Sequence, residues 1–226
     1  MSKMTPLVAA LSTNPFFAGL GGDVVEHIAD LCVTQILDDG ETLFMKGDPG
    51  DALYGVRRGR VLITTSTPAG KQLTLNVLGS GDLFGEIALL DGRKRTADAI
   101  ASGRTELFVI RRADFQKLLR DQPEIALRLI ELLCERTRWT SERMEEASLH
   151  ALPRRLASRL VKLADDFGEE IEMSQEDLSV LVGAARETVN RQLQEWRKAG
   201  IIELGRSRVR IVDMGRLKAS AAAEEE

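Results

Sequence analysis

The sequence predicts an α+β protein in which a β-rich first half is followed by a long helix and a helical C-terminal part. Between Leu37 and Ile110, short runs rich in Val, Ile and Thr alternate with turns that contain Gly or Pro, a texture typical of a barrel or a sandwich. Of these we expect a jelly-roll-like barrel. The stretch after Pro123 contains neither Gly nor Pro as far as Ala147, which predicts one uninterrupted helix. Beyond Pro153, short amphipathic patterns and a hairpin pattern complete the chain.

Length and charge fit two modest domains joined by a helix. The chain has 226 residues, of which 43% are hydrophobic and 29% charged, enough for two cores of ordinary composition. We expect a β-roll domain over residues 1–122, a helix with a hinge over 123–152, a helical domain over 153–218 and a disordered tail over 219–226. The net charge is −4, but residues 153–218 hold 13 Lys or Arg against 11 Asp or Glu, a balance of +2. This balance permits contact with nucleic acid without requiring it.

Membrane insertion, secretion and metal chemistry all lack a sequence signal. No apolar run approaches the ~20 residues that span a bilayer. The first 15 residues show no basic segment followed by an apolar stretch, so we expect a cytoplasmic protein with no membrane partner. Cys32, Cys134, His27 and His150 are too sparse for a disulfide framework or a metal site, and we expect them to be packing or surface residues.

The β-rich region is expected to follow short helices over residues 16–36. Its predicted strands are Thr42–Met45, Ala52–Val56, Arg60–Thr65, Leu73–Val77 and Thr105–Ile110. Glycines in the turns between them are expected to supply positive φ angles.

The long helix carries a stripe that mixes apolar and polar side chains near one face. The stripe consists of Ile125, Leu129, Leu132, Leu133, Arg136, Trp139, Thr140, Arg143, Met144 and Ala147. About 25 helical residues span nearly 40 Å, which is more than one small barrel covers. We therefore favour a helix–helix seam in a homodimer, and the alternative is a helix that packs only on its own barrel. A hinge is expected at His150–Pro153, where the helix pattern breaks.

The C-terminal domain shows the pattern of two short helices joined at a glycine. An amphipathic helix over residues 154–168 comes first. Ser174 then caps a helix in which Asp177 takes the place of a capping-box acid, and Gly183 ends that helix. A second helix is expected from about Ala185 to Lys198. The side chains expected to face inward in this pair are Leu178, Leu181, Val182, Val189, Leu193 and Trp196. This is the helix-turn-helix pattern.

The second helix and the hairpin after it supply candidate DNA contacts. The N-terminal end of such a helix enters the major groove, where Arg pairs with guanine and Glu accepts from cytosine. Arg206 and Arg208, with Arg210, give the hairpin a basic tip that suits phosphates, which makes the unit a winged helix-turn-helix. The plainer alternative for the charged helix is a solvated face with i,i+4 ion pairs. The expected DNA contacts are Ser174, Arg186, Glu187, Thr188, Asn190, Arg191, Arg206 and Arg208.

The run Leu181–Arg191 resembles the cyclic AMP receptor protein branch of the Crp–Fnr regulator family. The branch pattern Arg-Glu-x-x-x-Arg is present as Arg186, Glu187 and Arg191. The resemblance implies a homodimer that binds palindromes of TGTGA-like half-sites in double-stranded DNA. Two positions depart from the best-known member, since Ala185 replaces a phosphate-contacting serine and Glu176 replaces a glutamine. Both departures are expected to weaken DNA affinity or alter its salt dependence, without touching the residues that contact bases.

A second motif lies in the β-rich half, where Phe84–Leu90 is followed by Arg93–Ala97. Gly85 allows close backbone approach to an anion, Arg95 can hold a phosphate with paired donors, and Thr96 adds a hydroxyl. Glu86 can accept from a ribose hydroxyl. The plainer alternative is a turn with a surface ion pair.

Together this motif resembles the phosphate-binding cassette of cyclic-nucleotide-binding domains, so the β-roll is expected to bind cyclic AMP. The cassette implies a binding set of Gly85, Glu86, Ile87, Ala88, Arg95 and Thr96. The pair Thr140 and Ser141 resembles the pair that contacts adenine in the same branch, with Ser141 acting from the partner subunit. A trivial polar helix face is the alternative for this pair. The choice between cyclic AMP and cyclic GMP depends on these two hydroxyls alone.

The resemblance covers about Asn14 to Met214 and predicts a cyclic AMP-responsive transcription regulator, with RNA polymerase as a further partner. Ligand binding is expected to swing the recognition helices at the hinge, through different ligand affinities of the two arrangements. A ligand-independent DNA-binding regulator with a vestigial nucleotide site is the main alternative. An enzyme is disfavoured because no nucleophile–base pair, P-loop or metal site is visible. The motifs leave activation and repression equally open.

Overall fold

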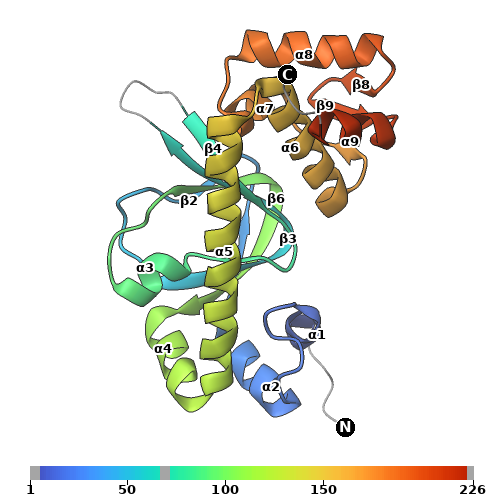
Figure 1. The fold of residues 1–226 in the computed structure, drawn as a ribbon. Helices are drawn as coiled ribbons and strands as arrows, with labels where there is room; N and C mark the ends of the chain where they lie inside the picture. The colour runs from blue at the N-terminus through green and yellow to red at the C-terminus, as the bar shows by residue number, and fades with distance from the viewer. Residues whose placement is uncertain (1–5, 67–71, 223–226) are drawn as a thin grey trace. The chain divides into compact units, whose positions relative to one another are not determined.

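The computed structural model describes residues 6–66 and 72–222, which belong to two compact units (Figure 1). The first unit comprises residues 1–65 and 76–135, and the second comprises residues 66–75 and 136–226. The stretch 123–152, which the sequence separates as a segment of its own, is shared between these units. No helix among the described residues is long and apolar enough to cross a membrane.

One six-stranded sheet forms the framework of the first unit. Its strands are β1 (Cys32–Leu37), β2 (Thr42–Phe44), β3 (Ala52–Ser66), β4 (Gln72–Leu78), β5 (Leu83–Phe84) and β6 (Asp98–Arg111). The order along the sheet is β1-β6-β3-β4, with β2 added to β6 and β5 added to β3. The sheet is not closed, so the expected barrel closure is wrong while the β-rich class is confirmed.

The segment before the sheet differs from the expected short helices over residues 16–36. Helices α1 (Pro6–Thr13) and α2 (Gly22–Leu31) are followed directly by β1, which pairs with β6. The strand was missed because it lacks the apolar alternation of a half-buried strand. It buries only Leu37 and leaves Val33 and Ile36 more than half exposed.

Strand β3 unites two runs that the sequence predicts as separate strands. Its pairing with β6 shifts register on both sides of Arg58. Gly59 has a φ of +90°, and a Cβ there would lie 2.6 Å from the carbonyl oxygen of Arg104. The chain therefore bends at this glycine and continues as one strand.

Two apolar clusters fill the core of the first unit. One contains Phe17, Phe108 and Phe115 together with Ile125 and Leu129 from the long helix. The other lies under the candidate nucleotide site, and its members include Tyr54, Val61, Phe84 and Leu107.

The long helix is confirmed as α5 (Pro123–Leu149), which follows α4 (Arg112–Asp121). The expected seam is wrong at its N-terminal end, because Ile125 and Leu129 are buried in the core of their own unit. Another face of α5 leaves apolar side chains in solvent. Leu127 is 63%, Ile130 57% and Met144 72% exposed.

The second unit contains a helix-turn-helix with a three-stranded sheet. Its elements after α5 are α6 (Leu152–Phe167), β7 (Glu170–Ile171), α7 (Gln175–Val182), α8 (Arg186–Lys198), β8 (Ile202–Gly205), β9 (Arg208–Ile211) and α9 (Met214–Ala222). The sheet order is β7-β9-β8. The expected tail disorder from residue 219 is wrong as far as Ala222, since α9 reaches that residue and buries Leu217. Residues 223–226 lie outside the described residues.

Candidate nucleotide site and DNA-reading surface

The candidate nucleotide site starts at Gly85, between β5 and α3 (Glu86–Asp91). Gly85 has a φ of +83°, which L side chains rarely adopt. A Cβ at this position would lie 2.7 Å from Nη1 of Arg95 and 3.1 Å from Cδ2 of Tyr54. Glycine is therefore required both for the turn and for the close approach of Arg95.

Arg95 is a buried cation that pairs with a solvent-exposed carboxylate. Its side chain is 2% exposed, with Nη1 donating to the Gly85 carbonyl at 2.8 Å and Nη2 to the Ala52 carbonyl at 3.0 Å. The carboxylate of Asp51 is largely in solvent, and its Oδ1 lies 3.7 Å from Nη2 of Arg95. The Nε atom of Arg95 is buried without a hydrogen-bond partner in the described structure. A buried charge of this kind favours an additional anion.

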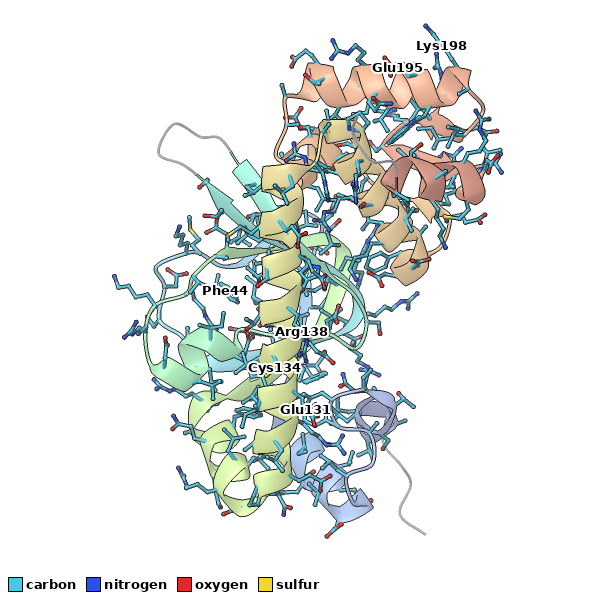
Figure 2. All side chains as sticks on the ribbon, viewed as in Figure 1. Phe44, Glu131, Cys134, Arg138, Glu195 and Lys198 are labelled. Carbon is cyan, nitrogen blue, oxygen red and sulfur yellow. The ribbon has the colours of Figure 1, made fainter. Side chains whose placement is uncertain are left out.

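An aromatic cluster holds the guanidinium of Arg95 from one side. The guanidinium carbon lies 4.3 Å from the ring centre of Phe44 (Figure 2). It lies 5.4 Å from the ring centre of Tyr54. Tyr54 stacks on Phe84 with 5.3 Å between ring centres. Burial raises the pKa of the Tyr54 phenol, although the charge of Arg95 partly opposes this shift. The sequence motif did not include Phe44 and Tyr54, because strands far from Arg95 in the sequence supply them.

The remaining cassette residues divide into buried and exposed groups. Glu86 and Ala88 are 1% and 2% exposed, whereas Ile87 is 45% exposed and Thr96 is open to solvent. The backbone of Arg95 exchanges hydrogen bonds with the loop at residues 47–48. Gly50 lies against Ala88, since a Cβ at Gly50 would come within 2.3 Å of the Ala88 Cβ. The structure thus joins the cassette to the upstream loop.

Thr140 and Ser141 belong to the second unit. Both side chains are exposed, and each hydroxyl donates to a carbonyl one turn back in α5. Thr140 donates to the Arg136 carbonyl at 2.8 Å, and Ser141 donates to the Thr137 carbonyl at 3.0 Å. In this state their free lone pairs are hydrogen-bond acceptors.

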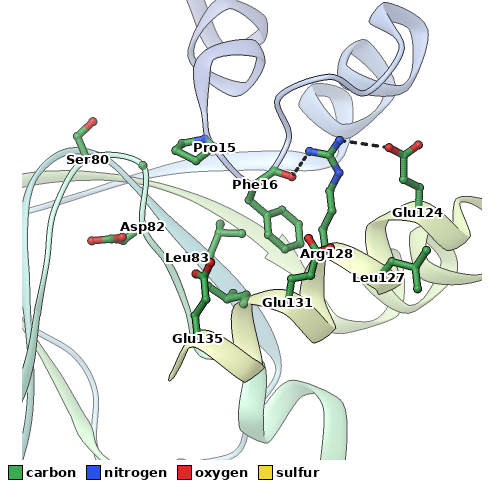
Figure 3. Close-up of a pocket in the computed structure, with 12 residues that line it drawn as sticks. Pro15, Phe16, Ser80, Asp82, Leu83, Glu124, Leu127, Arg128, Glu131 and Glu135 are labelled. Atoms are coloured by element: carbon green, nitrogen blue, oxygen red, sulfur yellow. Dashed lines mark hydrogen bonds and ion pairs between the residues drawn. The ribbon is translucent and has the colours of Figure 1, made fainter. Parts of the chain in front are cut away.

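A cavity of about 520 Å³ in the first unit is separate from the cassette (Figure 3). Four carboxylates line it, from Asp82, Glu124, Glu131 and Glu135. Arg128 at its edge pairs with Glu124 at 3.2 Å and donates to the Phe16 carbonyl at 3.1 Å. Because four acids face a single base in the lining, this cavity disfavours a phosphate ligand.

The first helix of the helix-turn-helix begins with the predicted capping box. The Ser174 hydroxyl accepts from the Asp177 amide at 3.1 Å, and the Asp177 carboxylate accepts from the Ser174 amide at 3.0 Å. Gly183 ends α7 with a φ of +66°. The predicted inward side chains are all buried, namely Leu178, Leu181, Val182, Val189, Leu193 and Trp196. The orientation of the second helix is confirmed by this burial.

The outward face of α8 carries the expected charged residues. Arg186, Glu187 and Arg191 are exposed, whereas Thr188 and Asn190 are half-buried. The Asn190 side-chain oxygen accepts from Gln194 at 3.4 Å.

One cation of this face already has an acidic partner. Nη1 of Arg186 lies 3.0 Å from Oε2 of Glu176 in α7. The sequence predicts an effect of Glu176 on DNA affinity but not this ion pair, because the two residues are ten positions apart on different helices.

The wing formed by β8 and β9 holds its arginines in ion pairs. Nη1 of Arg208 lies 2.6 Å from Oε1 of Glu170. Nη2 of Arg210 lies 2.7 Å from Oε2 of Glu203. The Glu203 carboxylate raises the pKa of Arg210. Arg206 lies in the exposed turn between the strands. Two of the three expected wing cations are therefore neutralised within the chain.

Comparisons with known proteins match both units. A model of the cyclic nucleotide-binding domain matches residues 34–122, and a model of the Crp-like helix-turn-helix domain matches residues 154–220. The cyclic AMP receptor protein of Thermus thermophilus is 34% identical over 88% of this chain and 92% of its own length. The CRP-like cAMP-activated global transcriptional regulator of Mycobacterium tuberculosis is 33% identical over 79% and 83% of the two chains.

The chain is also similar to a solved structure and to a regulator that is named for nitrogen control. The crystal structure of the Thermus thermophilus catabolite activator protein is 33% identical, covers 92% of this chain and 98% of its own, and has a TM-score of 0.54. A global nitrogen regulator of Synechococcus elongatus is 28% identical over 76% and 82% of the two chains. The relatives are regulators rather than enzymes. On these matches the chain belongs to the Crp–Fnr family of DNA-binding transcription regulators and carries a cyclic nucleotide-binding domain.

Proposed function

We propose that this regulator responds to cyclic AMP and acts as a homodimer on palindromes with TGTGA-like half-sites. It works in the cytoplasm and has RNA polymerase as a further partner. The names of the Thermus and Mycobacterium relatives support cyclic AMP as the ligand. The name of the Synechococcus elongatus relative, a global nitrogen regulator, does not mention a nucleotide. The ligand assignment therefore depends on the residues of this chain.

The observation that carries the proposal is the environment of Arg95. A guanidinium that is 2% exposed has neutral carbonyls as its hydrogen-bond acceptors and a partly solvated carboxylate at 3.7 Å. A cyclic phosphate carries one negative charge and acceptor oxygens, which fit these donors. The absence of a Cβ at Gly85 lets Nη1 of Arg95 approach the backbone there, so the glycine fixes the position of the guanidinium that we assign to the phosphate.

The state of Thr140 and Ser141 supports adenine over guanine. Both hydroxyl protons are used within α5, which leaves acceptor lone pairs toward a ligand. The exocyclic group of adenine is a donating amine, whereas guanine presents an accepting oxygen at the same position. A hydroxyl in this state can accept from the exocyclic amine of adenine but not from the carbonyl oxygen that guanine has at the same position.

The exposed apolar face of α5 supports a dimer. Leu127, Ile130 and Cys134 of the first unit are exposed at three- and four-residue spacing, and Ser141 and Met144 continue the same heptad positions in the second unit. Such a repeat is the pattern of a helix–helix seam. The seam proposed here replaces the stripe that begins at Ile125.

Coupling between the two functions follows from differential binding. Cyclic AMP shifts the equilibrium only if it binds more tightly to the arrangement that binds DNA. In that arrangement two copies of α8 occupy major grooves about 34 Å apart along the duplex.

The test is fluorescence anisotropy with a labelled duplex at fixed salt. The duplex carries TGTGA and TCACA half-sites with about six base pairs between them, which sets the half-sites about one helical turn apart. DNA affinity is measured without nucleotide, with cyclic AMP and with cyclic GMP. We expect cyclic AMP alone to raise the affinity by about tenfold, a coupling of about 1.4 kcal/mol.

The matched variants are Arg95→Gln and Arg93→Gln. Both remove one positive charge from the same loop, but the Arg93 side chain is 86% exposed and Arg95 is buried. We expect Arg95→Gln to abolish the response to cyclic AMP and Arg93→Gln to keep it. Equal responses in the two variants would contradict the role given to Arg95.

A ligand-independent regulator of the same fold, with a vestigial nucleotide site, is the second candidate. For that candidate, the palindrome binds tightly and no nucleotide changes the affinity. Equal affinity for the palindrome and a scrambled duplex would instead contradict the half-site assigned to Arg186, Glu187 and Arg191.

A further inference from the structure

The ion pair between Arg186 and Glu176 lies on the surface that the family uses to contact DNA. Arg186 is the first residue of α8, and Glu176 is the second residue of α7. The two charged atoms are 3.0 Å apart, and the side chains are 62% and 59% exposed. DNA therefore has open access to both partners.

The start of α7 fixes the backbone turn that carries Glu176. The Ser174–Asp177 capping box fixes this turn, so Asp177 is occupied and Glu176 is the carboxylate left to face Arg186. Negative charge is stabilised in the first turn of a helix by unpaired amide groups. Release of Arg186 thus leaves a negative charge on the first turn of α7.

We propose that Glu176 is an internal competitor for Arg186, which DNA must displace before Nη1 of Arg186 can contact a base or a phosphate. The proposal rests on the DNA-binding function of the family and not on cyclic AMP or a particular half-site. An arginine uses two donors to pair with guanine, and Glu176 occupies one of the guanidinium nitrogens.

After displacement, the freed carboxylate of Glu176 is expected to lower DNA affinity further because of where the first helix lies. The first helix crosses the DNA backbone, so the freed carboxylate of Glu176 lies on the helix that approaches the phosphates. The competitor therefore lowers affinity for every duplex. Because specificity is a difference between affinities, Glu176 in this role sets the strength of DNA binding and leaves the sequence preference to the base contacts.

The expected change in DNA affinity follows from the solvent exposure of the Arg186–Glu176 ion pair. Solvent-exposed ion pairs contribute little, and loss of this one is expected to raise DNA affinity by roughly two- to fivefold. The change is measurable by anisotropy in the full-length protein.

The experiment compares Glu176→Gln with Glu195→Gln. Both variants remove one negative charge from the helix-turn-helix, but Glu195 is near the far end of α8, beside Lys198 (Figure 2). Each variant is measured on the TGTGA palindrome and on a scrambled duplex of the same length, at several low salt concentrations. Thermal melting confirms that each variant is folded.

A double-mutant cycle separates competition from simple repulsion of phosphates. Glu176→Gln is also made in an Arg186→Gln background, where there is no guanidinium to release. We expect a gain of about threefold in the parent and a gain below about 1.5-fold in that background. Glu195→Gln is expected to change affinity by less than about 1.5-fold in the parent.

Two results would overturn the proposal. One is an equal gain in both backgrounds, which assigns the effect to general repulsion. The other is a loss of affinity in Glu176→Gln, which means that Glu176 orients Arg186 toward the DNA. A wrong half-site assignment would give a different result. The palindrome and the scrambled duplex would then bind with equal affinity, while Glu176→Gln would still raise the affinity for both.

Discussion

Gly85 is a residue whose role can be tested without changing a charge. Its positive φ and its contact with Arg95 are two separate requirements. Gly103 offers a matched comparison, because it has a φ of +75° and nothing within 4 Å of a Cβ placed on it. The difference between alanine at the two positions therefore isolates the close approach from the backbone conformation.

We expect Gly103→Ala to reduce the free energy of unfolding by about 1 kcal/mol, the cost of left-handed backbone. Gly85→Ala is expected to cost more than Gly103→Ala, because its Cβ displaces Arg95. It is also expected to weaken cyclic AMP binding by about tenfold. Urea unfolding and calorimetric titration measure the two effects. Equal nucleotide affinity in both variants would show that Arg95 does not need its observed position.

The residues of the candidate nucleotide site were predictable to different degrees. Gly85, Glu86, Arg95 and Thr96 lie within twelve positions of one another, so a local motif contains them. The guanidinium partners Phe44, Tyr54 and Ala52 come from strands more than 40 positions before Arg95. Only the sheet pairing brings them to the cassette, and no local pattern encodes that pairing.

At the scale of single elements, the capping box of α7 sets where the helix-turn-helix begins. Both of its reciprocal hydrogen bonds are present. The box also fixes the turn that carries Glu176, which connects helix stability to DNA binding.

We expect Ser174→Ala to reduce the free energy of unfolding by about 1 kcal/mol, because α7 loses its cap. Ser174→Thr is expected to retain most of that stability. Ser220→Ala serves as the control, since the Ser220 hydroxyl bonds within an exposed helix turn. Urea denaturation provides the values, and equal stabilities of the two alanine variants would contradict the role of the cap.

The proposed seam on α5 makes a prediction about the oligomeric state. Ile130→Asp places a charge in the seam and is expected to convert the dimer to a monomer in sedimentation. Ile36→Asp is the control, because Ile36 on β1 is 51% exposed, similar to the 57% of Ile130. A dimer that survives Ile130→Asp would place the interface elsewhere.

The two cysteines give a second readout of the same seam. Cys134 is exposed on α5, whereas burial raises the pKa of Cys32 to about 12. The raised pKa keeps Cys32 protonated below that pH, so it is a poor nucleophile near pH 8. We expect mild oxidation at pH 8 to cross-link the wild-type dimer and Cys32→Ser but not Cys134→Ser.

Periodicity located the elements better than it located their faces. The long helix was predictable from its length without Gly or Pro, but its buried face was not, because Leu127 and Ile130 are as apolar as Ile125 and Leu129. Strand β1 and helix α9 were missed for a related reason. Each buries one aliphatic side chain, Leu37 or Leu217, which is too weak a signal against a polar background.

At the scale of the whole molecule, the proposed regulator has two ligands, and their coupling must be reciprocal. If cyclic AMP raises DNA affinity about tenfold, the palindrome must raise cyclic AMP affinity by the same factor. Calorimetric titration of cyclic AMP with and without the duplex tests this expectation. Arg95→Gln is the control for nucleotide binding, and equal cyclic AMP affinities with and without DNA would contradict the coupling.

The connection between α5 and α6 limits how such coupling can be transmitted. Helix α5 ends at Leu149 and α6 begins at Leu152, so only His150 and Ala151 lie between them. Each residue contributes two soft torsions, which gives four, whereas the free placement of one rigid body on another requires six. A reorientation that uses this joint alone is therefore confined to a restricted family of paths. A two-residue connection of this kind therefore restricts the directions in which α6 can turn relative to α5.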